Sequence, residues 1–338
     1  MNSEVDLSII VPIYNVAPYL EQCLKSLCQL TGVRYECILV DDGSTDHSPR
    51  IAASYAQHYP DRFIFLRQEH RGQGAARNLA IRHARGMYLG FVDADDWVTK
   101  EMFHKMLASA IKKDADLVFC NFFKVTQNGE SEVIEYPVIS SEGIRPYQCR
   151  SVLLNSGNGV TNKIIKRSIF ANHNIRFPEG IIFEDFAIIP FLISRCDLVV
   201  AVPEPLYHYR IRSDSSTHTP NEKIYELFDA CNHLQSLVDD RYREEVCFII
   251  LREIFFYALP RYINVLGPAN FALFHAKSTA YAQAACLQWT MNAYVKELTC
   301  FKRIYLSLSL RAYRWPIKIL SRLKQLKSLI RRSRSPLS

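Results

Sequence analysis

The chain has 338 residues, of which 49% are hydrophobic and 22% charged. This length allows about two domains, and the composition excludes a disordered chain, a collagen and a small disulfide-stapled protein. The net charge of +7 arises at the C-terminal end, because residues 301–338 hold 11 Lys and Arg and no acid, whereas residues 1–300 hold 30 basic and 34 acidic groups. An acidic body argues against a nucleic-acid-binding protein, so we expect no nucleic acid partner.

The first hundred residues alternate between strand-like and helix-like segments. Apolar runs rich in β-branched residues predict buried strands at residues 5–11, 36–40, 63–66 and 87–92. Helical spacing predicts helices at 18–30, from about 49 with Ser48 as N-cap, and at 74–85, closed by Gly86. This alternation is typical of parallel βαβ units, so the predicted fold class is α/β, an open sheet with helices on both faces.

The rest of the chain is less regular. The pattern predicts a strand at 117–123, a polar loop or hairpin at 126–147, helices at 164–170 and 184–194, and an extended segment at 198–202. From about residue 221 onward the pattern is helical, which predicts a mainly helical C-terminal region.

Cysteine usage and hydropathy indicate the compartment. The ten cysteines form no C-x-x-C pair, and most stand in apolar runs, so we predict reduced core thiols rather than disulfides or metal ligands. No uninterrupted run of about 18 apolar residues predicts a transmembrane span, and the acidic start MNSEVD is unlike a signal peptide. We therefore expect a cytoplasmic protein.

Polar residues follow several predicted strands. Tyr14 follows the first strand, Asp41 and Asp42 the second, and Asp93 and Asp95 the fourth. Ligands of open α/β sheets bind beyond the carboxyl ends of the strands, where these side chains should meet. The chain lacks both G-x-G-x-x-G after the first strand and the Walker A pattern, which argues against a dehydrogenase and a P-loop nucleotidase. Strand-end carboxylates can instead hold a divalent cation that binds a diphosphate. By itself D-A-D could equally be a solvated turn, but its position at the end of an apolar strand, in register with Asp41 and Asp42, favours a functional role.

Seven segments carry a resemblance to a known family. IIVPIYNVAPYLEQCLKSL, ILVDDGSTDHS, GQGAARNLAI and YLGFVDADDWV, in this order, resemble the inverting family 2 glycosyltransferases with the GT-A fold. NKIIKRSIF, FEDFAIIPFLI and PLYHYRIRSDSST match later landmarks of the same family, so the resemblance covers about residues 5–218. The chain looks most like bacterial enzymes that build capsule, O-antigen or teichoic-acid sugars.

The resemblance implies an activity and a domain organisation. It implies transfer from a nucleotide-sugar, usually a UDP-sugar, to a glycan or lipid-linked acceptor, with a divalent cation (Mn²⁺ or Mg²⁺). Residues 1–220 would form the GT-A domain, with a nucleotide-sugar half at about 1–97 and an acceptor half at about 98–220. A helical region at 221–300 would follow, open to a role as acceptor platform or homo-oligomer interface, and then a basic tail at 301–338.

The donor residues are implied by the same resemblance. Tyr14 matches the aromatic residue that stacks on the base, with Pro12 beside it. Asp42, or else Asp41, matches the carboxylate that accepts the uracil N3–H, and Arg77 matches a contact to the nucleotide or its phosphates. The structural alternatives are a core tyrosine, an Asx turn and a surface helix charge. The chain departs from the commoner family pattern at residues 70–71, where His-Arg replaces Asn-Gly or Asn-x.

The charged groups around the diphosphate are also implied. Asp93 resembles the ribose-side or metal-side carboxylate and Asp95 the direct metal ligand. His208 matches a position that some members use as a further ligand, although a structural histidine is an equal alternative. Lys163 and Arg212 are candidates for neutralising the diphosphate.

The catalytic base is assigned to the Glu184-Asp185 pair. In the family the Asp of this pair takes the proton of the acceptor hydroxyl, so we predict Asp185 as general base and Glu184 as a supporting or acceptor contact. An acid at a helix start is favoured electrostatically in any case. An inverting transfer needs a single base, because no covalent sugar–enzyme intermediate forms.

The C-terminal tail has an amphipathic pattern. Between residues 304 and 330 apolar residues recur at steps of three and four, and Lys and Arg occupy much of the remaining surface. Such a basic helix predicts binding to the anionic cytoplasmic face of the inner membrane, with packing on the protein as the alternative.

Two other function classes compete with this interpretation. One is a sugar-nucleotide-binding scaffold at the membrane that has lost catalysis. The other is a nucleotidyltransferase, for which a glycine-rich basic loop is expected after the first strand; PIYNVAPYLEQ stands there instead.

Overall fold

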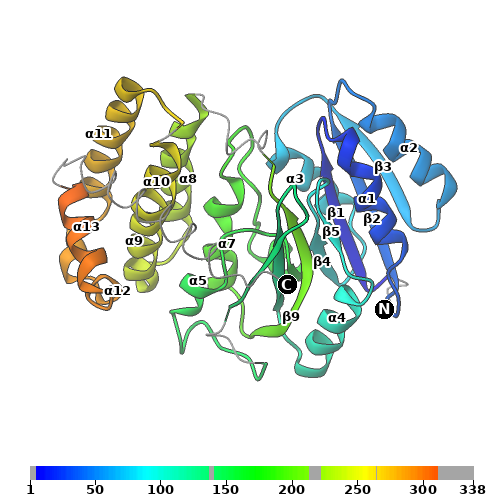
Figure 1. Cartoon of the computed structure of the whole chain (residues 1–338). Helices are drawn as coiled ribbons and strands as arrows, with labels where there is room; N and C mark the ends of the chain where they lie inside the picture. Colours follow the sequence, from blue (N-terminus) through cyan, green and yellow to red (C-terminus); the bar gives the residue numbers. More distant parts are fainter. Residues whose placement is uncertain (1–4, 137–140, 213–221, 264, 311–338) are drawn as a thin grey trace, which may run out of the picture. The chain divides into compact units, whose positions relative to one another are not determined.

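The computed structural model describes residues 5–136, 141–212, 222–263 and 265–310 (Figure 1). The chain forms two compact units, the first made of Met1–Ser215 with Asp229–Leu237 and the second of Ser216–Phe228 with Val238–Ser338. The domain limits at residues 220 and 300 stay predictions.

Within the described residues, a nine-stranded mixed sheet is the centre of the first unit. Its strand order is β3-β2-β1-β4-β8-β6-β9-β5, and β7 pairs with β6. The strands are β1 Leu7–Ile13, β2 Tyr35–Asp42, β3 Phe63–Gln68, β4 Tyr88–Phe91, β5 Trp97–Val98, β6 Leu117–Val125, β7 Ser131–Ile134, β8 Lys163–Lys166 and β9 Val199–Arg210. The first four are parallel to their neighbours in this group, as the βαβ pattern predicts.

Helices cover both faces of the sheet. The helices of this part of the chain are α1 Ala17–Cys28, α2 Ser48–His58, α3 Gln73–His83, α4 Met102–Lys113, α5 Val152–Asn155, α6 Arg167–Asn172 and α7 Glu184–Ser194. Residues of α1, α2 and α4 share one core with β1 and β2. The strand order reverses between β1 and β4, so the crossover helix α3 covers the opposite face, where it contacts α7. Such a reversal marks the ligand-binding edge of an open sheet.

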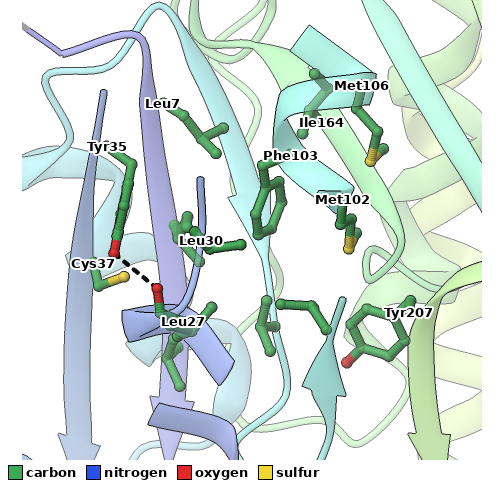
Figure 2. Close-up of a cluster of buried hydrophobic side chains, with 14 of the residues drawn as sticks. Leu7, Leu27, Leu30, Tyr35, Cys37, Met102, Phe103, Met106, Ile164 and Tyr207 are labelled. Atoms are coloured by element: carbon green, nitrogen blue, oxygen red, sulfur yellow. Dashed lines mark hydrogen bonds between the residues drawn. The ribbon is translucent and has the colours of Figure 1, made fainter. Parts of the chain in front are cut away.

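Figure 2 shows part of the core between the sheet and these helices. Leu7 of β1, Leu27 of α1 and Phe103 of α4 are all buried in it. The Tyr35 hydroxyl donates to the Leu27 carbonyl at 2.7 Å, which satisfies a polar group inside this apolar cluster. Every residue of β1 and β2 is buried, because both sheet faces are covered.

The second unit is helical, as its sequence predicts. Its helices, together with α8, which the two units share, are η1 Glu222–Tyr225, α8 Glu226–Leu237, η2 Asp240–Tyr242, α9 Arg243–Leu251, η3 Arg252–Ala258 (a π-helix), α10 Leu259–Tyr262, α11 Pro268–Ala285, η4 Trp289–Met291, α12 Ala293–Lys296 and α13 Cys300–Leu310. Helix α13 buries Tyr305, Leu306 and Leu310, whereas Ile304 of the predicted apolar stripe is 53% exposed. The rest of the predicted tail helix, residues 311–338, lies outside the described residues.

The structure corrects three local predictions. Residues 164–170 are not one helix: β8 precedes α6, because the short apolar run inserts between β4 and β6 in the sheet. Ser48 lies inside α2 and its hydroxyl accepts the Val16 N–H at 3.0 Å, so it is no N-cap. Gly86 does not cap α3 in a left-handed turn; a Cβ there would lie 2.4 Å from the Ser8 nitrogen, so close approach to β1 requires glycine.

Two further expectations concern the chain as a whole. All ten cysteines are free thiols, and six of them are buried. None of the helices among the described residues is long and apolar enough to cross a membrane.

Candidate active site

The loops after β1 and β2 are joined by hydrogen bonds at the carboxyl edge of the sheet. The Asn15 N–H donates to Ser44 Oγ at 3.0 Å, and the Ala17 N–H donates to Asp46 Oδ2 at 2.9 Å. Asn15 has φ of 48°, a left-handed conformation that asparagine tolerates better than most residues. The polar residues of the DGSTD segment therefore hold the loop that carries Tyr14 in place.

Asp42 is the centre of a second loop connection. Its Oδ1 accepts the Arg71 N–H at 2.9 Å and the Gln68 amide at 2.7 Å. Its Oδ2 accepts the Gly72 N–H at 2.8 Å and lies 2.9 Å from His70 Nδ1. An ionised carboxylate has about four acceptor sites, so these donors occupy the capacity of the buried Asp42 side chain.

The other predicted base-binding residues lie around Asp42. Tyr14 is 43% exposed and stacks on the His70 ring at 4.1 Å between centroids and 19° between planes. Asp41 is fully buried, with Oδ2 3.0 Å from Arg67 Nε, and Pro12 is buried in β1. Among the residues predicted to bind the base, Tyr14 is therefore exposed, whereas Pro12, Asp41 and Asp42 are buried.

The acidic turn after β4 is held from β9. The Tyr207 hydroxyl donates to Asp96 Oδ2 at 2.6 Å and accepts the Asp93 N–H at 3.2 Å. The Arg210 N–H donates to Asp96 Oδ1 at 2.7 Å. Burial, reinforced by the negative charge of Asp95, raises the pKa of Asp96 well above its usual range. Asp96 therefore points inward and anchors the turn that carries Asp93 and Asp95.

Two arginines at the end of β9 reach over this turn. Arg212 Nε lies 3.0 Å from Asp95 Oδ2, and the Arg210 side chain donates to the Asp95 carbonyl at 2.7 Å. Both guanidinium groups also lie over the Tyr19 ring, at 4.9 and 5.2 Å from its centroid. The structure therefore places the predicted pair Asp95 and Arg212 in contact.

His208 lies in an aromatic stack on the same strand. Its ring is stacked between Trp97, at 4.9 Å, and Phe123, at 4.8 Å between centroids. Burial lowers the pKa of His208, because desolvation disfavours the charged imidazolium. The His208 ring packs on these two aromatic rings, and its role as a metal ligand stays a prediction.

Arg77 connects the two acidic segments. The completely buried guanidinium donates to Glu184 Oε1 at 2.5 Å, to Asp185 Oδ1 at 2.8 Å and to Asp93 Oδ1 at 3.1 Å. Burial raises the pKa of Asp93 to about 6 and that of Glu184 to about 7, and in both cases the Arg77 charge opposes the rise. Arg77 thereby places the predicted base beside the acidic turn.

The sequence around Arg77 explains how helix α3 reaches this position. A Cβ on Gly74 would lie 2.2 Å from the Pro178 carbonyl oxygen, so only glycine permits this close approach. The Asn78 side chain donates to the Phe177 carbonyl at 2.8 Å and accepts the Phe177 N–H at 2.9 Å. The GAARN segment thus contacts Phe177 and Pro178, which lie in the loop before α7.

Asp185 lies in the first turn of helix α7, and its two oxygens accept from the Arg77 side chain and from the backbone. Its Oδ2 accepts the Val160 N–H at 2.9 Å, and its side chain is 22% exposed, against 6% for Glu184. Lys163 is buried and donates to the Gly159 carbonyl at 2.7 Å. Burial lowers the pKa of Lys163 to about 8 against the opposing charge of Asp185. Of the Glu184–Asp185 pair, Asp185 has the more exposed carboxylate.

The acidic turn offers the ligand chemistry of a hard divalent cation. Gln73 and Arg77 both donate to Oδ1 of Asp93, and the Asp93 side chain is 27% exposed. Carboxylate oxygens are the ligands that Mg²⁺ and Mn²⁺ prefer. Among the described residues no three His, Cys, Asp or Glu side chains are grouped to hold a metal, so a cation here would need oxygens from its substrate or from water.

Several residues of this network were not singled out from the sequence. Gln73, Asn78 and Tyr207 contact the predicted site residues or the segments that carry them. The Gln and the Asn belong to the GQGAARN segment and Tyr207 to YHYR, so both motifs contained them. Their partners are about 20 to 114 positions away, which no local pattern reveals.

Comparisons with known proteins agree with this architecture. The model of the family "Glycosyl transferase family 2" matches residues 8–173. The uncharacterized glycosyltransferase EpsJ of Bacillus subtilis is 32% identical over 254 residues, which cover 72% of this chain and 69% of the relative. The minor teichoic acid biosynthesis protein GgaB of Bacillus subtilis is 31% identical over 232 residues, 63% of this chain and 24% of the relative.

A solved structure shares the fold. Residues 1–349 of S. aureus TarS, crystallised with UDP-GlcNAc, superpose with a TM-score of 0.72 at 17% identity, covering 95% of this chain and 92% of that one. The predicted family and fold are thereby confirmed. The chain belongs to glycosyltransferase family 2, and it is a glycosyltransferase with the GT-A fold.

Proposed function

We propose that this glycosyltransferase is metal-dependent and inverting, and that it moves a sugar from a UDP-sugar to a hydroxyl of a glycan or lipid-linked acceptor in bacterial surface polysaccharide synthesis. The observation that carries the proposal is the Arg77 contact set. It joins Asp185, at the start of α7, to Asp93, in the acidic turn. A base and a diphosphate-binding turn must be neighbours in a direct displacement, and these two carboxylates share one guanidinium.

The donor is assigned to the edge formed by the loops after β1, β2 and β4. The exposed Tyr14 ring offers a stacking surface for a base, and the Asp42 carboxylate would accept the N–H of the base in place of one of its present donors. The complex of TarS with UDP-GlcNAc supports a UDP-sugar, and the name of GgaB supports surface polysaccharide synthesis. Asp41 remains the alternative acceptor for the base.

Asp185 is the proposed general base. As the acceptor oxygen attacks the anomeric carbon, its proton passes to Asp185, and the bond from that carbon to the diphosphate oxygen breaks on the opposite side. Arg77 and the Val160 N–H hold both oxygens of Asp185, so the carboxylate is oriented before the substrate arrives. Glu184, buried on the same guanidinium, supports this arrangement.

Asp95 and Asp93 are the proposed ligands of the divalent cation, with His208 as a further candidate. When bound, the cation would stabilise negative charge on the leaving diphosphate. Arg212, which contacts Asp95, and Lys163, whose charge interacts with that of Asp185, are proposed to neutralise the diphosphate. Arg77 is predicted to contact the nucleotide-sugar. Because it donates a hydrogen bond to Asp93, it can act on the nucleotide-sugar indirectly by orienting that carboxylate.

The membrane is the proposed location of the acceptor. The described start of the tail carries exposed Lys302, Arg303 and Ile304, and acids are absent from the whole of residues 301–338. Basic charge with exposed apolar side chains favours the anionic cytoplasmic surface of a membrane. We therefore propose a peripheral protein on the cytoplasmic face of the inner membrane.

The test is donor hydrolysis across UDP-, GDP- and TDP-sugars, with and without Mn²⁺. We expect turnover of one UDP-sugar, abolished by a chelator. Asp185→Asn should reduce turnover about a thousandfold, because it removes the proton acceptor, and it should leave UDP affinity within about twofold, because the proposed base-binding residues Tyr14 and Asp42 are unchanged. Asp61→Asn, an exposed aspartate elsewhere, is the matched control. Unchanged turnover in Asp185→Asn would refute the base assignment, and UDP binding without turnover in the wild type would favour the scaffold.

A further inference from the structure

His70 stands where the chain departs from the commoner family pattern, and its ring makes two specific contacts. It stacks on Tyr14 with centroids 4.1 Å apart, and its Nδ1 lies 2.9 Å from Asp42 Oδ2. Nδ1 also lies 3.2 Å from the Asp42 carbonyl oxygen. Both partners of Nδ1 can only accept, so Nδ1 carries the proton and donates it.

These two contacts are those that the proposed function assigns to the nucleobase. A uracil ring would stack on Tyr14 and donate its N3–H to Asp42. The imidazole is likewise a flat ring with an N–H at its edge, and it uses the same tyrosine and the same carboxylate. A base and the His70 ring therefore cannot occupy the same face of Tyr14 and the same acceptor site of Asp42 Oδ2 at once.

The other donors to Asp42 are less easily displaced than His70. Arg71 and Gly72 donate through backbone amides, and Gln68 lies directly across from Asp42 in the paired strand. The His70 side chain is 49% exposed, and rotation about its own bonds would move it into solvent. Gly43 packs closely against the backbone of residue 70, because a Cβ there would lie 2.8 Å from the His70 nitrogen.

We propose that His70 is a built-in competitor for the nucleobase: its imidazole occupies the base subsite on Tyr14 and Asp42, and it turns out when a nucleoside diphosphate whose base offers a ring N–H binds. This inference rests on the proposed function, since it assumes that Tyr14 and Asp42 receive the base. It makes residue 70 a determinant of donor affinity in this chain.

The first test is UDP affinity by calorimetry on the full chain. His70→Ala removes both competing contacts, so UDP should bind about tenfold more tightly. His70→Phe keeps a ring on Tyr14 but has no N–H, so its affinity should lie between those of the wild type and His70→Ala. The matched control is His58→Ala, an exposed histidine at the end of α2, whose UDP affinity should equal that of the wild type.

The second test follows the imidazole itself by proton NMR. Stacking on Tyr14 shifts the His70 ring protons, so UDP should move their signal toward its position in Tyr14→Ala. Equal or weaker UDP binding in His70→Ala, or a His70 signal that UDP does not move, would overturn the inference. If neither the wild type nor His70→Ala binds UDP or any other nucleotide, the proposed donor site itself is wrong.

Discussion

Replacing Arg77 by methionine should both destabilise the protein and inactivate it. Methionine keeps much of the apolar length of arginine and removes the cation that contacts Asp93, Glu184 and Asp185. Breaking a buried ion pair by removing one partner costs about 3–5 kcal/mol, because a charge stays buried without its partner. At roughly 2–4 °C per kcal/mol, the melting temperature should fall by roughly 6–20 °C.

The stability that Arg77→Met loses should increase as the pH rises. Burial raises the pKa of Asp93 to about 6 and of Glu184 to about 7, above their ordinary values, so the folded state binds protons more tightly than the unfolded chain. Stability from these groups is therefore present at low pH and is lost as pH rises through about 4 to 7. Without Arg77 both pKa values rise further, so the deficit of the variant should be largest at pH 8 and smallest near pH 5.

The stability assay is thermal unfolding, monitored by circular dichroism at pH 5, 6.5 and 8. Donor hydrolysis is then measured at a pH at which the variant is still folded. Arg82→Met is the matched control, because Arg82 is an exposed residue of the same helix. It should shift the melting temperature by less than about 2 °C. A similarly small shift in Arg77→Met, or a deficit that grows toward pH 5, would refute the reasoning about this buried cation.

Two further substitutions test the positioning of the site. Gly74→Ala puts a Cβ 2.2 Å from the Pro178 carbonyl oxygen, so unfolding in urea should show a loss of about 1–3 kcal/mol, and wild-type stability would contradict this close packing. Tyr207→Phe keeps the buried ring but loses the hydroxyl that bridges Asp93 and Asp96, so the KM for the donor should rise about tenfold; an unchanged KM with lower stability would indicate a structural role alone.

Much of the fold follows from local patterns. The parallel strands β1 to β4 and helix α7 lie within about two residues of their predicted ranges, because a strand covered on both faces leaves a short apolar run and a buried helix leaves a longer one. The polar residues at the strand ends were also predictable in position, since parallel strands end at a common edge. The predicted helix at 164–170 failed because a short buried apolar run suits either structure.

The sequence by itself determined the residue types and the edge of the sheet at which they gather. Only the tertiary structure decided which partners they take. Arg77 reads as a helix charge near a nucleotide, yet its guanidinium contacts carboxylates 16 and about 108 residues away. His70 reads as a departure from a motif, yet it lies on Tyr14 and Asp42. Such contacts join segments distant in the chain, and their geometry depends on how helices and strands pack rather than on any local period.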